Sequence, residues 1–401
     1  MQPLELRPGI YAVGALDWEL PQMHGYNTPR GVTYNSYLIV DEHITLIDTV
    51  KYYKFDELMS RISKVVDPPK IDYVVVNHAE PDHGSALPKV RALLPEASIF
   101  CSKRGVDVIE GNYRQDFGLK PVADGETLSL GKRSLVFKEL PMLHWPDSMV
   151  SYCPEEGILF SNDAFGQHMA TAERFDDEVG WSITSYEAGK YYANIVMPFA
   201  QQVQGALAAL GSLPLSLICP SHGVILRSHI AEMLENYRKW SSHEAEESVA
   251  IIYYSMWGAT KLLAEAIADG AQAEGLLVTL RNMESYHYSD VMYDVLVNRG
   301  IALGSPTLNN GLHPEMASMT AYLTGLRPRD RVGLAFGSYG WGGQSVGMLQ
   351  EVMGQLKWET PLEPLKIKWK PTEEDLLAAT EAGRALAQQV KAWPRPNTRP
   401  V

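Results

Sequence analysis

Residues 74–84 read Val-Val-Val-Asn-His-Ala-Glu-Pro-Asp-His-Gly, and this stretch decides what the N-terminal half of the chain can be. The valines indicate the end of a buried strand. Four potential metal ligands follow within six residues, in the pattern His-x-Glu-x-Asp-His: His78, Glu80, Asp82 and His83. Four such side chains packed so tightly would repel one another or need partners, which a plain polar turn does not supply. We therefore expect this loop to contribute ligands to two neighbouring metals.

Three later segments also place a ligand-type residue directly after an apolar run. His144 follows the run 133–143, Asp163 directly follows the run 158–162, and His222 follows the run 215–220. Any one of them alone is more often a capping carboxylate or a hydrogen-bonded histidine. Their occurrence together with the first loop favours a single centre built from all seven residues.

The chain of 401 residues exceeds what one hydrophobic core usually serves, so two domains are expected. The polar segment 241–248 separates two sequence patterns. Short β-rich runs with turns and interspersed helices precede it, which is typical of an α+β domain. After it, five strands alternate with helices, which predicts a doubly wound parallel sheet. We expect domains at residues 1–247 and 248–401.

The C-terminal domain carries three loops that follow predicted strands, at 255–260, 304–310 and 336–343. The first, Ser-Met-Trp-Gly-Ala-Thr, offers hydroxyls and backbone N–H groups at a helix start, where a phosphate can bind without cationic side chains. By itself it is also compatible with a plain βα turn. Because all three loops should gather at the carboxyl edge of the sheet, the predicted ligand-binding residues are Ser255, Met256, Trp257, Gly258, Ala259, Thr260, Pro306, Thr307, Leu308, Asn309, Ser338, Tyr339, Gly340, Trp341 and Gly342.

Four motifs carry a family resemblance: His-Ala-Glu-Pro-Asp-His at 78–83, Leu-His-Trp-Pro-Asp-Ser-Met at 143–149, Ser-Asn-Asp-Ala-Phe-Gly-Gln-His at 161–168 and Pro-Ser-His-Gly at 220–223. With them the chain resembles the metallo-β-lactamase superfamily and, more narrowly, the flavodiiron proteins, over nearly its whole length. Hydrolytic relatives typically read His-x-His-x-Asp-His, whereas Glu80 replaces the middle histidine here. Added carboxylate oxygens favour iron, while a nitrogen-rich set suits zinc and hydrolysis.

The resemblance implies a metallo-β-lactamase-like αββα sandwich followed by a flavodoxin-like domain. It also implies FMN, held by the three loops with Trp341 or Tyr339 against the isoalloxazine ring, and two non-haem irons. One iron would take His78, Glu80 and His144, and the other Asp82, His83 and His222, with Asp163 bridging. Within the family the position of His83 need not reach the metal. Residues expected to assist catalysis near the irons are His24, Tyr26, Tyr191 and Tyr192, for which ordinary packing is the alternative.

The same resemblance implies electron flow from FMN to iron and reduction of O2 to water, of NO to N2O, or of both. It implies a head-to-tail homodimer or a dimer of dimers. The donor would be rubredoxin or a similar small protein, with reduced deazaflavin as an alternative. Net charge is −13, of which residues 248–401 carry −1 and residues 1–247 carry −12. An acidic donor can therefore dock on the FMN domain without strong repulsion, and nucleic acid is not an expected partner.

The three cysteines, Cys101, Cys153 and Cys219, are far apart and form no C-x-x-C pair, which fits a reducing cytoplasm. The N-terminal residues lack the pattern of a secretory signal, and no stretch approaches the roughly 18 apolar residues of a membrane span. Two alternatives remain open at this point. One is a metallo-β-lactamase-type hydrolase with an accessory flavodoxin domain, and the other is a flavodoxin-like electron carrier whose N-terminal domain only docks partners.

Overall fold

The computed structural model describes residues 2–393, which form two compact units. The first unit ends at Tyr237 and excludes the short segment Ala193–Ala200, which belongs with the residues from Arg238 onward. Helix α8 (Ile230–Ser241) and strand β17 (Glu246–Tyr253) occupy the region where the domain boundary is predicted. The polar segment 241–248 thus runs from a helix end into a strand, and the contacts divide ten residues earlier than the predicted 247/248 boundary.

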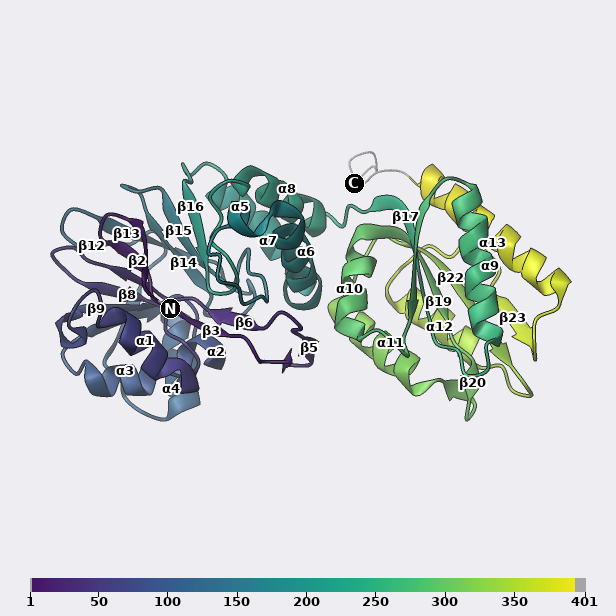
Figure 1. Cartoon of the computed structure of the whole chain (residues 1–401), viewed down its shortest axis with the longest axis horizontal. Helices are drawn as coiled ribbons and strands as arrows, with labels where there is room; N and C mark the ends of the chain where they lie inside the picture. Colours follow the sequence, from purple (N-terminus) through teal and green to yellow (C-terminus); the bar gives the residue numbers. More distant parts are fainter. Residues whose placement is uncertain (1, 394–401) are drawn as a thin grey trace. The chain divides into compact units, whose positions relative to one another are not determined.

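The first unit contains two large β-sheets of mixed strand direction (Figure 1). The seven-stranded sheet has the order β1-β2-β7-β8-β9-β10-β11, with the strands Leu4–Arg7, Ile10–Ala12, Tyr37–Ile39, Thr45–Ile47, Tyr73–Val76, Ser98–Ser102 and Leu119–Val122. The five-stranded sheet has the order β12-β13-β14-β15-β16, with the strands Thr127–Ser129, Ser134–Glu139, Met149–Cys153, Ile158–Asn162 and Leu217–Pro220.

A shared apolar core joins these two sheets face to face. Val75 of one sheet and Phe160 of the other belong to this core, and both are almost fully buried. A second cluster lies between the seven-stranded sheet and its outer helices α1 (Phe55–Ile62), α3 (Leu87–Leu93) and α4 (Lys103–Tyr113). Helices α5 (Asp176–Val179), α6 (Trp181–Tyr191), α7 (Ala200–Leu210) and α8 cover the other sheet (Figure 1). The predicted αββα sandwich is confirmed.

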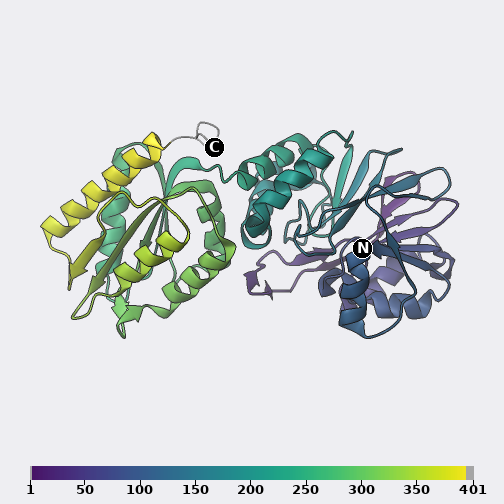
Figure 2. The ribbon, with the colours of Figure 1, turned by 180° about the vertical axis from the view of Figure 1, so that it is seen from behind.

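The second unit is a five-stranded parallel sheet of order β18-β17-β19-β22-β23. Besides β17, its strands are Leu277–Asn282, Asn298–Gly304, Val332–Tyr339 and Leu365–Lys368. Helices α9 (Ala259–Ala273) and α13 (Glu373–Ala392) lie on one face, and α10 (Tyr288–Val297), α11 (Pro314–Leu326) and α12 (Ser345–Gln355) lie on the other (Figures 1 and 2). This is the predicted doubly wound, flavodoxin-like arrangement.

Two glycines allow helices α9 and α13 to approach closely. A Cβ atom on Gly270 would lie 1.9 Å from the carbonyl oxygen of Thr380, and one on Gly383 would lie 2.1 Å from that of Ile267. Any larger residue at either position would force the helices apart. This packing holds α9 in place, and with it the loop 255–260 that leads into its N-terminus.

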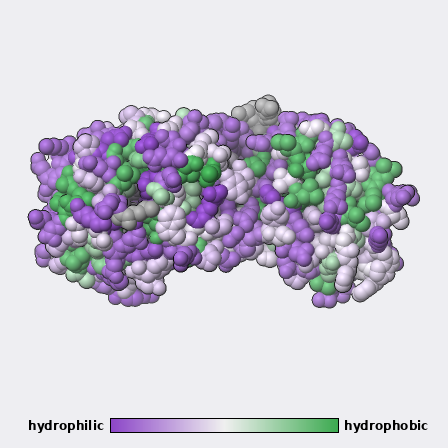
Figure 3. All heavy atoms as spheres, in the orientation of Figure 1, coloured by the Kyte–Doolittle hydropathy of each residue, from purple (hydrophilic) through white to green (hydrophobic). Residues whose placement is uncertain are grey.

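Hydrophilic and hydrophobic residues are interspersed on the face shown in Figure 3. Among the described residues, no helix has the length and apolar character needed to cross a membrane.

Candidate metal centre and flavin site

The four segments that carry the seven predicted ligands meet at one end of the sandwich. Strand β9 ends before His78, and the short helix α2 (Pro81–Gly84) then presents Asp82 and His83. His144 lies in the loop between β13 and β14, Asp163 directly follows β15, and His222 follows β16. Because β15 and β16 run parallel, their carboxyl ends bring Asp163 and His222 to the same edge.

A first group of side chains gathers around one oxygen of Asp163. Asp163 Oδ2 lies 3.6 Å from His78 Nε2 and 3.3 Å from His144 Nε2. Glu80 Oε2 lies 3.4 Å and 3.2 Å from the same two nitrogens. Two imidazole nitrogens and two carboxylates therefore face a common point, as the ligands of one metal would.

A second group meets the same carboxylate. His222 Nε2 lies 3.0 Å from Asp82 Oδ2 and 3.3 Å from Asp163 Oδ1. His83 Nε2 lies 3.2 Å from Asp82 Oδ1 and 3.6 Å from Asp163 Oδ2. Asp163 is thus common to both groups, and His83 turns its Nε2 toward the cluster.

Several polar atoms in this cluster have no hydrogen-bond partner although they are buried. These atoms are both carboxylate oxygens of Asp163, Oδ1 of Asp82 and Nε2 of His83. Leaving such atoms unpaired is costly, and cations coordinated by imidazole and carboxylate would satisfy them. The residues present therefore fit a pair of metal ions.

Hydrogen bonds behind the cluster select the tautomers of two histidines. His222 Nδ1 donates to the carbonyl oxygen of Thr33 at 2.6 Å, so Nε2 is the nitrogen available to a metal. His78 Nδ1 lies 3.0 Å from Oδ2 of the buried Asp147, which also accepts from the backbone N–H of Ala79 at 2.8 Å. Such partners orient metal-binding histidines. Sequence reasoning assigned no role to Asp147 or Thr33, although Asp147 stands in the same motif as His144.

The charges of the cluster are strongly interdependent. Burial alone would raise the pKa of Glu80, but hydrogen bonds from His144 and His78 lower it well below its usual range. Burial would lower the histidine pKa values, yet Asp163 with Glu80 raises the pKa of His144 to about 9, and Asp163 with Asp82 raises that of His222 to about 10. Without metal, the raised pKa values of His144 and His222 favour their protonated forms beside the carboxylates. Metal binding must displace these protons and therefore weakens as pH falls.

Two of the residues predicted to assist catalysis lie at the edge of the cluster. His24 Nε2 is 3.6 Å from Oε1 of Glu80, and its side chain is two-thirds exposed. The ring of Tyr26 packs edge-on against His168 at 4.7 Å between ring centroids. His24 therefore approaches Glu80 from an exposed position, while Tyr26 is buried against His168.

The adjacent tyrosines of helix α6 and its extension point in different directions. The ring of Tyr191 lies 4.8 Å from that of His168 and 6.1 Å from that of His222. The ring of Tyr192 instead packs on Tyr237 at 5.2 Å. Tyr191 thus borders the predicted ligand His222 directly. The ring of His168 lies 5.2 Å from that of His222. His168 is the last residue of the motif at 161–168, but the sequence alone gave no reason to assign it a role.

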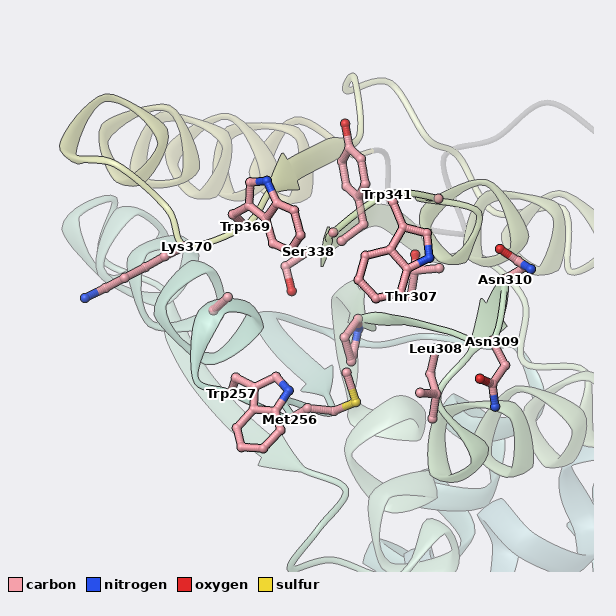
Figure 4. A pocket seen from close by; sticks show the side chains of 15 residues that line it. Met256, Trp257, Thr307, Leu308, Asn309, Asn310, Ser338, Trp341, Trp369 and Lys370 are labelled. Atoms are coloured by element: carbon pink, nitrogen blue, oxygen red, sulfur yellow. The ribbon is translucent and has the colours of Figure 1, made fainter.

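A cavity of about 510 Å³ opens at the carboxyl ends of β17, β19 and β22 in the second unit (Figure 4). Its size lies within the range of cofactor sites. Figure 4 shows the indole rings of Trp257, Trp341 and Trp369 around it, and the first two are 92% and 88% exposed. Of the predicted residues, those lining it are Met256, Trp257, Ala259, Pro306, Thr307, Leu308, Asn309, Ser338, Tyr339, Gly340, Trp341 and Gly342.

The three remaining predicted residues do not line this cavity. Ser255 Oγ accepts from the backbone N–H of Lys261 at 3.1 Å, so it caps the start of α9. Gly258 has φ of 87°, a left-handed conformation that suits glycine at the turn into that helix. Thr260 Oγ1 lies 2.9 Å from Ser338 Oγ, so hydroxyls of the first and third loops meet.

Sequence reasoning did not assign Asn310, Trp369 or Lys370, which also line the cavity. Trp369 and Lys370 directly follow β23, the edge strand of the sheet, so the rule that ligands bind at carboxyl ends would have identified them. Flat aromatic side chains around a helix N-terminus with adjacent hydroxyls suit a planar ring that carries one phosphate. The residues present fit FMN.

Comparisons with known proteins agree with both halves of this description. Residues 32–223 match the family described as ODP family beta lactamase, and residues 251–383 match flavodoxin. A nitric oxide reductase of Moorella thermoacetica is 43% identical over 395 residues, which cover 97% of this chain and 99% of that protein. A rubredoxin-oxygen oxidoreductase of Megalodesulfovibrio gigas is 40% identical over 400 residues, which cover 98% and 99%.

Solved structures extend the likeness to the whole backbone. The rubredoxin oxygen:oxidoreductase from Desulfovibrio gigas superposes with a TM-score of 0.95 at 39% identity, covering 99% of this chain and 100% of that one. The flavodiiron protein from Giardia intestinalis gives a TM-score of 0.96 at 36% identity, covering 98% of each chain. Because relatives that are 40% or more identical match nearly the whole chain, and the solved structures superpose over nearly all of it, the chain belongs to the flavodiiron proteins.

Proposed function

We propose that this protein is an oxidoreductase that passes electrons from an external donor through FMN to a non-haem diiron site, where O2 is reduced to water, NO to N2O, or both. The observation that carries the proposal is the position of Asp163 between two ligand groups, one of which contains Glu80. A flavin cavity in the same chain supports electron transfer. A metal-dependent hydrolase has no need of one.

The proposed ligands of one iron are His78, Glu80 and His144. Those of the other are Asp82, His83 and His222, and Asp163 is the proposed bridge. His83 is included because its buried Nε2 faces Asp82 and Asp163 and has no hydrogen-bond partner. When bound, the irons would bind the gas and change oxidation state, and FMN would exchange one or two electrons at a time.

Residues around the ligands control position and solvent access. Asp147 and Thr33 hold His78 and His222 so that their Nε2 atoms point into the cluster. Tyr191 and His168 pack beside His222 and keep that side free of bulk water, since both are almost fully buried. His24 lies on the exposed side, where its Nε2 can hold a proton next to Glu80.

In the second unit, the first turn of α9 and the hydroxyls of Thr260 and Ser338 are the proposed phosphate site. Trp341 or Tyr339 is proposed to stack on the flavin ring. Gly340 lies under Trp369, where a Cβ atom would come within 2.8 Å of the indole. A side chain there would disturb the lining of the cavity.

The proposed donor is rubredoxin or a similar small protein, and reduced deazaflavin is an alternative. The near-neutral charge of residues 248–401 suits an acidic donor, because the negative excess lies elsewhere in the chain. We also propose a head-to-tail homodimer or a dimer of dimers, which would bring the flavin of one subunit near the irons of another.

The test combines metal analysis with rapid mixing. The protein is expected to hold two irons per chain, and after reduction by photoreduced deazaflavin its flavin should reoxidise rapidly on mixing with O2 or with NO. Protein reconstituted with zinc in place of iron is the control and should reoxidise as slowly as free FMN. Two zinc ions and no iron in the native protein would instead indicate a hydrolase. Equal rates for the iron and zinc forms would indicate an electron carrier.

A further inference from the structure

The first unit contains a second cavity, of about 290 Å³, that none of the metal ligands lines. Among the described residues, Arg61 and Arg174 are the only charged residues in its lining, and the remaining lining residues are uncharged. The two arginines come from helix α1 and from the segment before α5. Two cations on one cavity with no anion in its lining are electrostatically unfavourable unless something neutralises them.

Only some of the hydrogen-bond donors of the Arg61 guanidinium have an acceptor in the protein. The residue is 5% exposed, and its Nη2 donates to Glu57 one turn earlier in α1. Its Nε is buried and has no hydrogen-bond partner. Glu57 Oε2 also lies 3.7 Å from Lys54 Nζ, which has Asp17 as a second carboxylate partner at 3.7 Å. Glu57 therefore pairs with one end of the Arg61 guanidinium and leaves its Nε without an acceptor.

Arg174 has no carboxylate partner among the described residues. Its Nη2 donates to the neutral amide oxygen of Asn35 at 2.8 Å, and its Nη1 is buried with no partner at all. Burial lowers the pKa of Arg174, and the charge of Arg61 lowers it further. Each guanidinium therefore keeps at least one donor unused within the protein.

A guanidinium satisfies its charge and its fork of donors best with an oxyanion, whereas water supplies acceptors but no charge. We infer that this cavity is a binding site for a small oxyanion of the phosphate class, held between Arg61 and Arg174. The volume admits inorganic phosphate or a small phosphate ester. The site belongs to the first unit alone and does not depend on the flavin.

The same hydrogen bonds connect this anion site to the metal centre. Asn35, which accepts from Arg174, donates through Nδ2 to the carbonyl oxygens of Pro220 and Gly223, both at 2.9 Å. Those two residues flank the His222 loop. An oxyanion that fixes Arg174 therefore also stabilises the loop that carries His222.

The test is a calorimetric titration of the iron- and FMN-loaded protein with inorganic phosphate, with chloride keeping the ionic strength constant. Saturable binding is expected, and both Arg61→Gln and Arg174→Gln should weaken it about 10- to 100-fold, because each removes a charge-assisted contact. Arg133→Gln is the matched control and should leave it unchanged, since Arg133 is already paired with Glu156 at 2.8 Å and with Pro8 O at 2.6 Å. Absence of saturable binding overturns the proposal, as does binding that both cavity variants retain in full.

A second measurement needs no variant and covers the case in which the glutamine variants do not fold. Crystals of the native protein grown without oxyanions are soaked in selenate, a heavier analogue of the same class. Anomalous density between Arg61 and Arg174 is expected, and a cavity that holds only water overturns the proposal. Competition titrations then distinguish inorganic phosphate, phosphate esters and carboxylates as ligands of the cavity. Displacement by glycerol phosphate extends the site to phosphate esters, whereas tighter binding of succinate than of phosphate overturns the phosphate class.

Discussion

Replacement of Asp147 by asparagine tests whether residues behind the ligands control metal binding. The side chain of Asp147 is 1% exposed, and its Oδ2 accepts from His78 Nδ1 at 3.0 Å and from Ala79 N at 2.8 Å. Burial would raise the pKa of Asp147, but His78 and the Ala79 N–H lower it, so the carboxylate is charged at neutral pH. Asp147→Asn keeps the shape of the side chain and removes this charge.

The expected effect is loss of iron affinity without loss of fold. Partners of metal-binding histidines typically contribute 10- to 100-fold in metal affinity, which corresponds to about 1.4–2.7 kcal/mol. We expect Asp147→Asn to lie in this range, because both hydrogen bonds to Oδ2 lose their charge assistance. The assay is anaerobic competition for iron with a coloured chelator of known affinity, with circular dichroism to check the fold.

Asp41→Asn is the matched control for this measurement. Asp41 is also a carboxylate with a 2% exposed side chain, and it accepts from the backbone N–H groups of Glu42 and Arg133 at 2.8 Å and 3.0 Å, but neither of these residues is a proposed metal ligand. The control should keep its iron affinity. If Asp147→Asn bound iron as tightly as the native protein, or if Asp41→Asn lost iron equally, the reasoning about His78 would be refuted.

Three further predictions use other parts of the chain. Glu80→His should lower the ratio of iron to zinc in protein purified from cells, as measured by elemental analysis, because it removes a hard oxygen ligand. Gly383→Ala should destabilise the second unit by about 1–3 kcal/mol in denaturant titrations, whereas Gly354→Ala, with no atom within 4 Å of the new Cβ, should be neutral or stabilising. Burial, reinforced by the charge of Arg331, lowers the pKa of His243 to about 4 in the folded protein, whereas a free histidine has a pKa of about 6.5. Between these two pH values the unfolded chain therefore binds more protons than the folded one. Stability should therefore fall as pH drops through this window, and His243→Asn should reduce the slope; an unchanged slope would contradict the assignment.

The sequence by itself determined the types of residue at both sites and the order of the elements. Glu80 indicated iron because its oxygen is a harder ligand than a histidine nitrogen, and that choice depends on side-chain chemistry alone. The alternation of strand and helix after residue 248 predicted the parallel sheet, and the loops that follow its strands predicted most of the flavin cavity. These features depend on local patterns, which a sequence displays directly.

Only the tertiary structure decided how distant residues combine. Nothing local indicates that Thr33 accepts from His222, that Tyr191 rather than Tyr192 borders the ligands, or that Arg61 and Arg174 share one cavity. Each of these contacts joins elements far apart in the chain, so it depends on how sheets and helices pack. Asp163 illustrates both contributions. The sequence identified it as a ligand-type residue at a strand end, and the fold alone placed its two oxygens between two groups of histidines.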